Sequence, residues 1–189
     1  MQQFITEYLE EHHKVLAKLE ASAGDIQRAA ERCITALANG HKLLICGNGG
    51  SAADAQHMAA ELVGRFIKDR PALAAIALTT DTSALTAIAN DYGYDEVFSR
   101  QVAGLASAGD VLIAISTSGS SSSVLAACEQ ARALGCEVVG LTGRDGGALK
   151  TCCETAVIAP ADDTARIQEC HIVMVHLLCA LIEQGLELA

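Results

Sequence analysis

The stretch "VLIAISTSGSSSSVLAA", residues 111–127, decides the fold class. Its first five residues are apolar and typical of a buried strand, and its last four suit a helix. Between them, seven of the eight residues from Ser116 to Ser123 carry a hydroxyl, and the other is Gly119. A strand joined to a helix by a short loop is the repeating unit of a parallel sheet.

The hydroxyl loop, residues 116–123, has two interpretations: a flexible serine linker or an anion-binding site. Loops within one strand–helix unit are short, and the free N–H groups at a helix start attract anions, so we favour the anion site. Gly119 permits a tight turn. Ser122 and Ser123 are also explained as simple helix caps. Because the loop lacks the lysine of a nucleotide-binding P-loop, it suits a sugar phosphate, and we expect no nucleotide cofactor.

The same alternation extends outward along the chain. It predicts strands at 42–46, 73–78, 111–115, 137–141 and 155–158, and helices at 51–66, 82–89, 95–106, 121–134, 148–152 and 163–187. We therefore expect one α/β domain over residues 1–189, a doubly wound, flavodoxin-like parallel sheet of about five strands. A helical pair in residues 1–40 precedes the core at 41–189. It packs either around the domain or against another subunit.

Composition excludes several classes of protein. The net charge of −10 argues against a nucleic-acid-binding surface. Residues 1–14 are polar, so we expect no secretory leader, and the apolar run 172–182 is too short to span a bilayer. We expect a soluble cytoplasmic protein with eight reduced cysteines. The adjacent pair Cys152-Cys153 is a weaker candidate for a ligand site.

Ligands of such folds bind at the carboxyl ends of the strands. The loop after the first strand, "GNGGSAADAQH", lacks the GxGxxG spacing of a dinucleotide site. It places the polar side chains of Asn48 and Ser51 at a helix N-terminus. By itself this loop is better explained as a turn followed by a helix cap.

Two pairs of chemically capable residues lie on helices. His57 and Glu61 are four apart and share a helix face. Gln168 and His176 are eight residues apart on the last helix. Their side chains therefore leave the helix in directions about 80° apart, and their Cα atoms lie about 12 Å apart. They contact one ligand only if both side chains bend towards it, or if two subunits each contribute residues to the site. Each residue alone also has an ordinary structural explanation, on the surface or in the core.

Three segments taken in order are more specific: "GNGGSAADAQHMAAEL" at 47–62, "STSGSS" at 116–121 and "RIQECHIVMVHLL" at 166–178. Together they resemble the sugar isomerase (SIS) family and, within it, the heptose isomerases. The resemblance covers essentially the whole chain, including the two N-terminal helices. The second segment alone marks only the wider SIS fold.

The resemblance implies a ketose–aldose isomerase that converts sedoheptulose 7-phosphate to D-glycero-D-manno-heptose 7-phosphate through an enediolate, for lipopolysaccharide precursors. It implies that Glu61 and His176 form the acid–base pair. We assign the carbon proton to Glu61 and the oxygen protons to His176, and the reverse assignment stays open. The implied phosphate and sugar positions are Ser116, Thr117, Ser118, Ser121, Asn48, Ser51, Asp91 and Gln168. Ala165 stands where some members carry an acidic residue.

The resemblance also implies a zinc ion, because His57, Glu61, Gln168 and His176 form a nitrogen and oxygen ligand set. The apolar stripe of the first helix, the long apolar last helix and the differing directions of Gln168 and His176 predict a homotetramer with active sites at subunit boundaries, and the resembled family forms tetramers. The alternative function is a non-catalytic SIS-fold tetramer that binds the replication initiator DnaA. The intact acid–base residues and hydroxyl loop favour the enzyme.

Overall fold

The computed structural model describes residues 1–187 and contains a five-stranded sheet whose strands are all parallel. The spatial order is β2-β1-β3-β4-β5, which is the flavodoxin-like order expected from the sequence. The strands are β1 (Leu43–Gly47), β2 (Ala75–Ala77), β3 (Val111–Ser116), β4 (Glu137–Gly143) and β5 (Thr155–Ala159). β1 and β3 are buried along their whole lengths, as strands covered on both faces must be.

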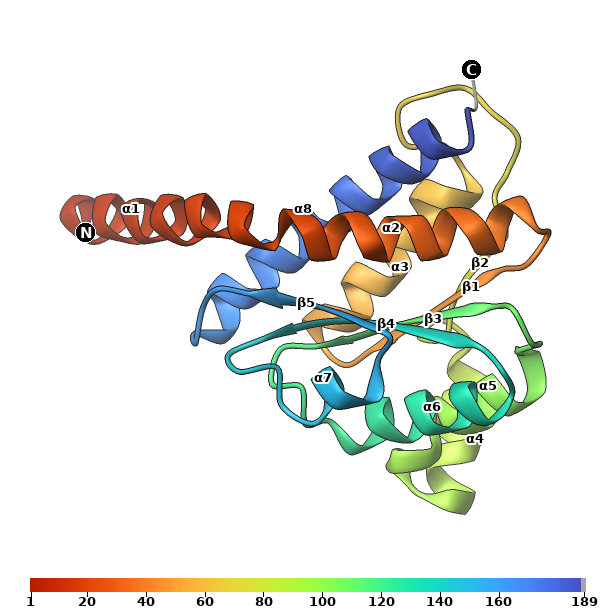
Figure 1. Ribbon diagram of the computed structural model, residues 1–189. Helices are drawn as coiled ribbons and strands as arrows, with labels where there is room; N and C mark the ends of the chain where they lie inside the picture. The colour runs from red at the N-terminus through yellow and green to blue at the C-terminus, as the bar shows by residue number, and fades with distance from the viewer. Residues whose placement is uncertain (188–189) are drawn as a thin grey trace.

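Helices cover both faces of this sheet (Figure 1). One face carries α2 (Ala23–Ala38), α3 (Gly50–Val63) and α8 (Thr164–Gly185). The other face carries α4 (Thr82–Tyr92), α5 (Ser99–Leu105), α6 (Ser122–Ala133) and α7 (Leu149–Cys152). The remaining elements are α1 (Gln2–Lys18) and two short 3₁₀ turns, η1 (Leu19–Ser22) and η2 (Tyr94–Glu96).

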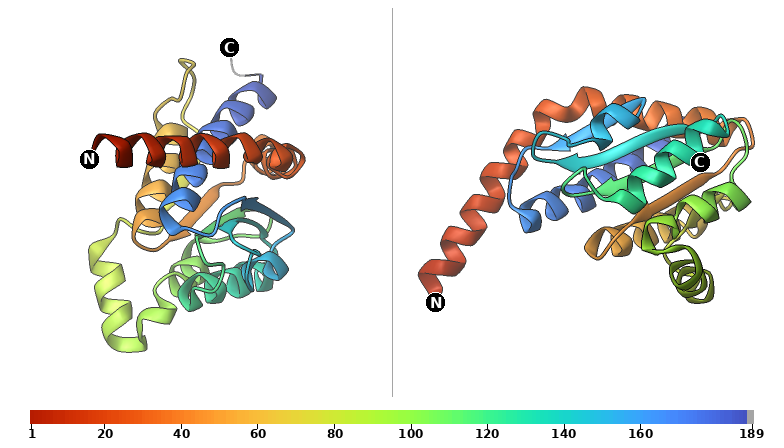
Figure 2. Two further views of the ribbon diagram at one scale, coloured as in Figure 1. Left: turned by 90° about the vertical axis from the view of Figure 1, so that its left-hand side faces the viewer. Right: turned by 90° about the horizontal axis from the view of Figure 1, so that it is seen from below.

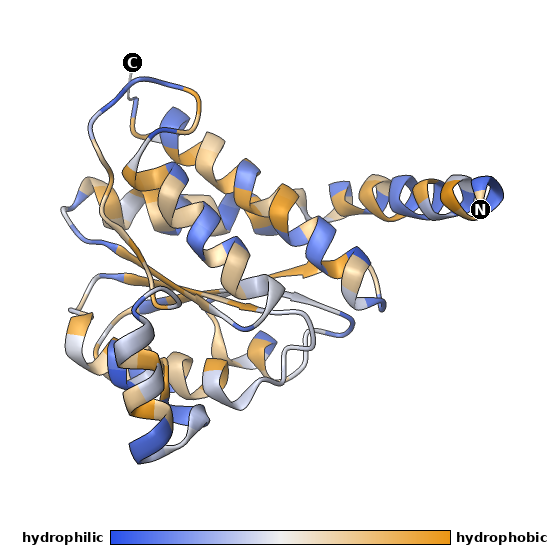
Figure 3. Cartoon of the chain, turned by 180° about the vertical axis from the view of Figure 1, so that it is seen from behind, coloured by the Kyte–Doolittle hydropathy of each residue, from blue (hydrophilic) through white to orange (hydrophobic). Residues whose placement is uncertain are grey.

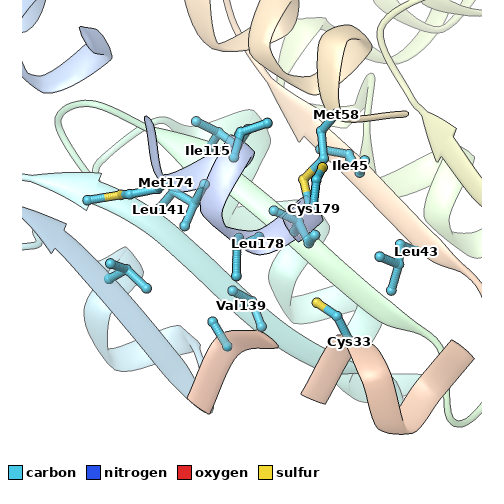
Figure 4. Packing of buried hydrophobic residues seen from close by; sticks show 14 of the residues in the cluster. Cys33, Leu43, Ile45, Met58, Ile115, Val139, Leu141, Met174, Leu178 and Cys179 are labelled. Carbon is cyan, nitrogen blue, oxygen red and sulfur yellow. The ribbon is translucent and has the colours of Figure 1, made fainter. Parts of the chain in front are cut away.

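Alternate residues of each strand point into two separate hydrophobic cores. On β1, Leu43 and Ile45 pack beneath α2, α3 and α8, whereas Leu44 and Cys46 pack on the opposite face. Figure 4 shows the first core, in which Leu178 and its neighbours on α8 lie over the sheet. The sheet thereby fixes α3 and α8 side by side on one face.

The two N-terminal helices play different parts. α2 belongs to the domain, because Ile26, Ala29 and Cys33 are buried in the first core. α1 has no buried residue and extends away from the domain (Figures 1 and 2). Its apolar side chains Phe4 and Leu9 are 68% and 51% exposed. Figure 3 shows hydrophobic positions alternating with hydrophilic ones along this helix, which the sheet does not cover.

Besides shifts of up to three residues at the ends of other elements, two predicted helices are shortened or divided in the structure. The helix expected at 51–66 ends at Val63, because Gly64 follows it and the amide of Phe66 donates to the Glu183 carboxylate instead of continuing the helix. The helix expected at 95–106 is split into η2 and α5. Both differences arise from contacts distant in sequence or from turns such as Gly93, whose φ is +93°.

The expectation that the apolar run 172–182 is too short to span a bilayer needs a correction, because this run belongs to the longer helix α8. Its apolar run is short, but the helix has 22 residues and is long and apolar enough to cross a bilayer by length and composition. Half of its most apolar window is buried against the sheet and the neighbouring helices, so packing within the domain accounts for its composition. All eight cysteines are free, as expected.

His171 on α8 is fully buried, and its Nε2 donates to the carbonyl oxygen of Thr142 at 3.0 Å. Its Nδ1 has no partner. Burial lowers the pKa of His171 to about 4, and the bond to Thr142 opposes this shift only partly. The folded protein therefore holds this imidazole neutral over a pH range in which the unfolded chain protonates it.

We predict that His171 makes the protein less stable in mild acid. The unfolded histidine binds a proton below about pH 6.5 and the folded one only below about pH 4, so this stabilisation is present above pH 6.5 and is lost as the pH falls to 4. The full loss is about 3 kcal/mol. Urea unfolding at several pH values measures it, with His171→Gln as the comparison because glutamine keeps a donor and does not titrate. Parallel pH profiles of the two proteins would contradict the prediction.

Candidate functional site

The hydroxyl loop follows β3 directly and turns sharply at Gly119, whose φ is +64°. A side chain at this position would collide with the carbonyl of Gly146, so both conformation and space require glycine. The loop leads into α6, whose N-cap is Ser121. The start of a helix thus lies next to the hydroxyl groups of the loop.

A cavity of about 180 Å³ lies between this loop and the loop after β1. No charged side chain is among the residues that line it, which are Asn48, Ser51, Ile115, Ser116, Thr117, Ser118 and Ser121. Six of them are binding residues expected from the sequence. We call this space the hydroxyl cavity. Hydroxyl and amide groups beside a helix N-terminus form a site that favours an anion such as a phosphate monoester.

Asn48 connects the two loops. Its Nδ2 donates to the hydroxyls of Ser121 at 2.8 Å and Ser123 at 3.0 Å. The Tyr94 hydroxyl donates to Asn48 Oδ1 at 2.7 Å. Ser123 is therefore a partner of Asn48 rather than a helix cap. Sequence reasoning missed Tyr94, since a tyrosine after a glycine turn carries no signal of this contact.

The second group of candidate residues comes from α3 and α8. His57 Nε2 lies 3.1 Å from His176 Nε2 and 3.2 Å from Glu61 Oε1. We call these three side chains the acid–base cluster. One chain brings them together without help from a second subunit. Their proximity supports the expectation that they act together, although 119 positions separate the two histidines.

Two other expected residues lie elsewhere. The amide of Gln168 packs against Gly50, at the start of α3, where any side chain would collide with it. Gln168 thus lies at the start of α3, beside the residue that precedes Ser51 of the hydroxyl cavity. Asp91 is exposed near the end of α4, where its Oδ1 accepts from Asn90 Nδ2 at 2.8 Å. Asp91 is not among the residues that line the hydroxyl cavity.

Known proteins resemble this chain over nearly its whole length. The SIS domain family model matches residues 7–143. A phosphoheptose isomerase from Nitratiruptor sp. is 56% identical over 186 residues, which cover 98% of this chain and 100% of that protein. The solved phosphoheptose isomerase of Neisseria gonorrhoeae superposes with a TM-score of 0.92 at 46% identity, covering 97% and 98% of the two chains. That of Francisella tularensis gives 0.93 at 40% identity, with the same coverage.

The chain belongs to the phosphoheptose isomerase family. It is an isomerase with a SIS domain, as the three sequence segments indicated. The alternative function, a non-catalytic partner of DnaA, receives no support from these relatives.

One titratable residue of this family member was not foreseen. Asp54 lies one turn before His57 on α3, is 6% exposed, and has no hydrogen-bond partner at Oδ2. Burial raises the pKa of Asp54 to about 6, and the nearby His57 opposes this shift. Asp54 and Gln168 line a second cavity of about 290 Å³ together with Ala165, Glu169 and Ile172. The sequence signal that could have identified Asp54 was its spacing from His57, which places the two residues one helical turn apart.

The acid–base cluster fits a metal ion in part. A tetrahedral zinc ion with bonds of about 2.0–2.1 Å holds its ligand atoms about 3.3 Å apart. The two spacings from His57 Nε2, 3.1 and 3.2 Å, are close to that value. Within residues 1–187, however, no three His, Cys, Asp or Glu side chains are already arranged as a metal site. Metal binding would therefore require side chains of the cluster to rearrange.

The adjacent cysteines are a poor alternative for a ligand site. Cys153 Sγ donates to the carbonyl oxygen of Leu149 at 2.8 Å. Burial raises the pKa of Cys153 to about 12, and the neighbouring Cys152 adds to this effect. Metals bind the thiolate form, which such a pKa disfavours.

Proposed function

We propose that this isomerase converts sedoheptulose 7-phosphate to D-glycero-D-manno-heptose 7-phosphate. The observation that carries the proposal is that one chain holds both a hydroxyl cavity suited to phosphate and, further along α3, the acid–base cluster. The names of the relatives point to the same substrate class.

The spacing of the two centres suits a long sugar phosphate. Ser51 lines the hydroxyl cavity, and His57 lies six residues further along the same helix, about 9 Å along the axis. A substrate that fills both places carries its phosphate at the end remote from its carbonyl group. Gln168 lies beside Gly50, next to the hydroxyl cavity, and lines a cavity with Asp54, which lies one turn before His57 on the same helix.

The reaction needs a proton moved between C1 and C2 of the sugar. In this assignment the Glu61 carboxylate removes the proton from C1 of the ketose, which gives an enediolate, and returns it to C2. His176 moves the accompanying proton between O1 and O2, as imidazole does near neutral pH. The hydroxyl cavity holds the phosphate in place, so that C1 and C2 stay beside the two acid–base groups.

We predict that Glu61→Gln lowers kcat by about two to four orders of magnitude, because the amide keeps the shape of the side chain and removes its basicity. A coupled isomerase assay with sedoheptulose 7-phosphate measures the loss. Glu129→Gln, on the exposed surface of α6, is the matched control and should behave as wild type. A near-normal kcat for Glu61→Gln would remove Glu61 from the mechanism. An inactive wild-type enzyme would overturn the proposed substrate.

We further propose that the enzyme uses a zinc ion. The residues that would hold it are His57, Glu61 and His176, joined by Gln168, whose amide would have to move from its place beside Gly50. A bound zinc ion would polarise the carbonyl group of the sugar and so stabilise the negative charge that develops on its oxygen. The two ligand-like spacings around His57 support this proposal.

We predict that the purified enzyme, incubated with zinc and dialysed, retains about one zinc ion per chain. Elemental analysis measures this content without reference to activity. His57→Ala should abolish it, because the histidine links both close spacings in the cluster. Cys152→Ser should retain the metal as the wild type does. Zinc that survives in His57→Ala, or that is absent from the wild type, would rule out this site.

We also propose a homotetramer with active sites near subunit boundaries, located in the cytoplasm, where it supplies heptose for lipopolysaccharide precursors. The exposed apolar face of α1, formed by Phe4, Ile5, Tyr8 and Leu9, supports assembly with further copies of the chain. The free cysteines suit a reducing compartment. The net charge of −10 gives no reason to expect nucleic acid as a partner.

We predict that Leu9→Glu breaks the assembly, because it places a charge on this apolar face. Size-exclusion chromatography with light scattering should show a particle of lower mass, and the isomerase activity should fall with it. Glu10→Gln, at the next position of the same exposed helix, should leave both unchanged. A wild-type chain that is fully active as a dilute monomer would contradict the proposed tetramer.

A further inference from the structure

We propose that Phe66 is a positioning residue for His176, and that a buried ion pair between Arg70 and Glu183 fixes Phe66 in place. The proposal rests on the acid–base role given above to His176. It assigns a function in the reaction to the loop between α3 and β2, which neither touches the hydroxyl cavity nor contributes to the acid–base cluster itself.

Glu183 anchors this loop to α8. Its side chain is buried, and its carboxylate accepts from the backbone amides of Phe66, Ile67 and Lys68 at 3.1, 3.2 and 3.2 Å. It also accepts from Arg70 Nε at 2.9 Å. Burial by itself would raise the pKa of Glu183, but these hydrogen bonds lower it, so the carboxylate stays ionised. Three consecutive backbone amides on one carboxylate leave this part of the loop little freedom.

Arg70 ties the same anchor to the end of α3. Its Nη1 donates to the carbonyl oxygen of Leu62 at 2.8 Å, and its Nη2 donates to that of Glu61 at 2.9 Å. These carbonyls belong to the last turn of the helix, which has no further amides of its own to pair with. The ion pair therefore joins the backbone at Glu61 to α8, the helix that carries His176.

Phe66 converts this anchor into a contact with the acid–base cluster. While its amide is held by Glu183, its ring stacks on the His176 imidazole, with centroids 5.7 Å apart and planes at 28°. The His57 ring lies 5.2 Å from the same imidazole. Contacts with two rings restrict the rotation of the imidazole and keep its Nε2 directed at His57. A group held in its reactive orientation loses less entropy at the transition state.

A purely structural role explains the anchor less well. Burying an ion pair carries a desolvation penalty that packing alone avoids. The neighbouring Ile67 is 67% exposed. Fixing this loop segment therefore does not serve to bury all of its apolar side chains. What this segment places inward is the Phe66 ring, against His176.

The first test compares three variants of the full-length enzyme. Phe66→Leu should lower kcat by about tenfold to a hundredfold, since small misplacements of catalytic groups have effects of this size. KM should change by less than about twofold, since the hydroxyl cavity is untouched, and the melting temperature should stay close to wild type. Phe66→Tyr keeps the ring and should restore kcat. Ile67→Ala, in the same loop, should match the wild type.

The second test asks whether the ion pair acts through Phe66. Glu183→Gln should also lower kcat. In the double variant that combines it with Phe66→Leu, kcat should be little lower than in Phe66→Leu alone. Fully additive losses would separate the ion pair from Phe66. The Phe66 variants leave the ion pair intact, so they test the stacking even if Glu183→Gln does not fold.

The third test does not depend on the substrate. In NMR spectra, the Phe66 ring should shift the His176 ring signals, identified with His176→Gln, and Phe66→Leu should remove that shift. Unchanged signals, an unchanged kcat, or a kcat that Phe66→Tyr does not restore would each overturn the proposal. If the wild type proves inactive on sedoheptulose 7-phosphate, the proposed function fails and the NMR result alone decides the positioning role.

Discussion

The parallel pairing of β1 with β3 is the constraint on which the rest of the site depends. The two strands run in register from Leu43 beside Val111 to Gly47 beside Ile115. Because they point the same way, their loops leave the sheet at the same edge. Asn48 can then reach across to Ser121, and the hydroxyl cavity forms between loops that are about 70 residues apart in sequence. An antiparallel arrangement would send these two loops to opposite edges.

A second constraint is the packing of α3 against α8 on one face of the sheet. Both helices present small or aliphatic residues to the first core, including Ala55 and Met58 on α3 and Val175 on α8. This contact leaves His57 and His176 facing each other at the rim. The buried pair of Arg70 and Glu183 joins the last turn of α3, which carries Glu61, to the C-terminal part of α8. The relative position of the acid–base groups is thus determined by packing as well as by polar contacts.

α1 shows how a segment outside the core can still bear on the site. The C-terminal half of α1 contacts the first turns of α8, where His12 Nδ1 lies 2.7 Å from Glu169 Oε2. Glu169 borders the cavity that also holds Asp54 and Gln168. Tyr8, on the apolar face of α1, has its hydroxyl 3.5 Å from Glu169 Oε1, so this face approaches the same cavity. The apolar face of α1 and the cavity lined by Gln168 therefore lie in one region of the molecule.

The sequence by itself determined the order of strands and helices, the parallel sheet and the two ligand loops, because these follow from local periodicity and turn residues such as Gly119. Only the tertiary structure decided that Ser123 bonds to Asn48, that Tyr94 joins them, and that α3 stops at Val63. It also brought His57 and His176 together while leaving Gln168 beside Gly50. Such contacts join residues far apart in the chain, and their geometry depends on how whole elements pack, which no local pattern of residues records.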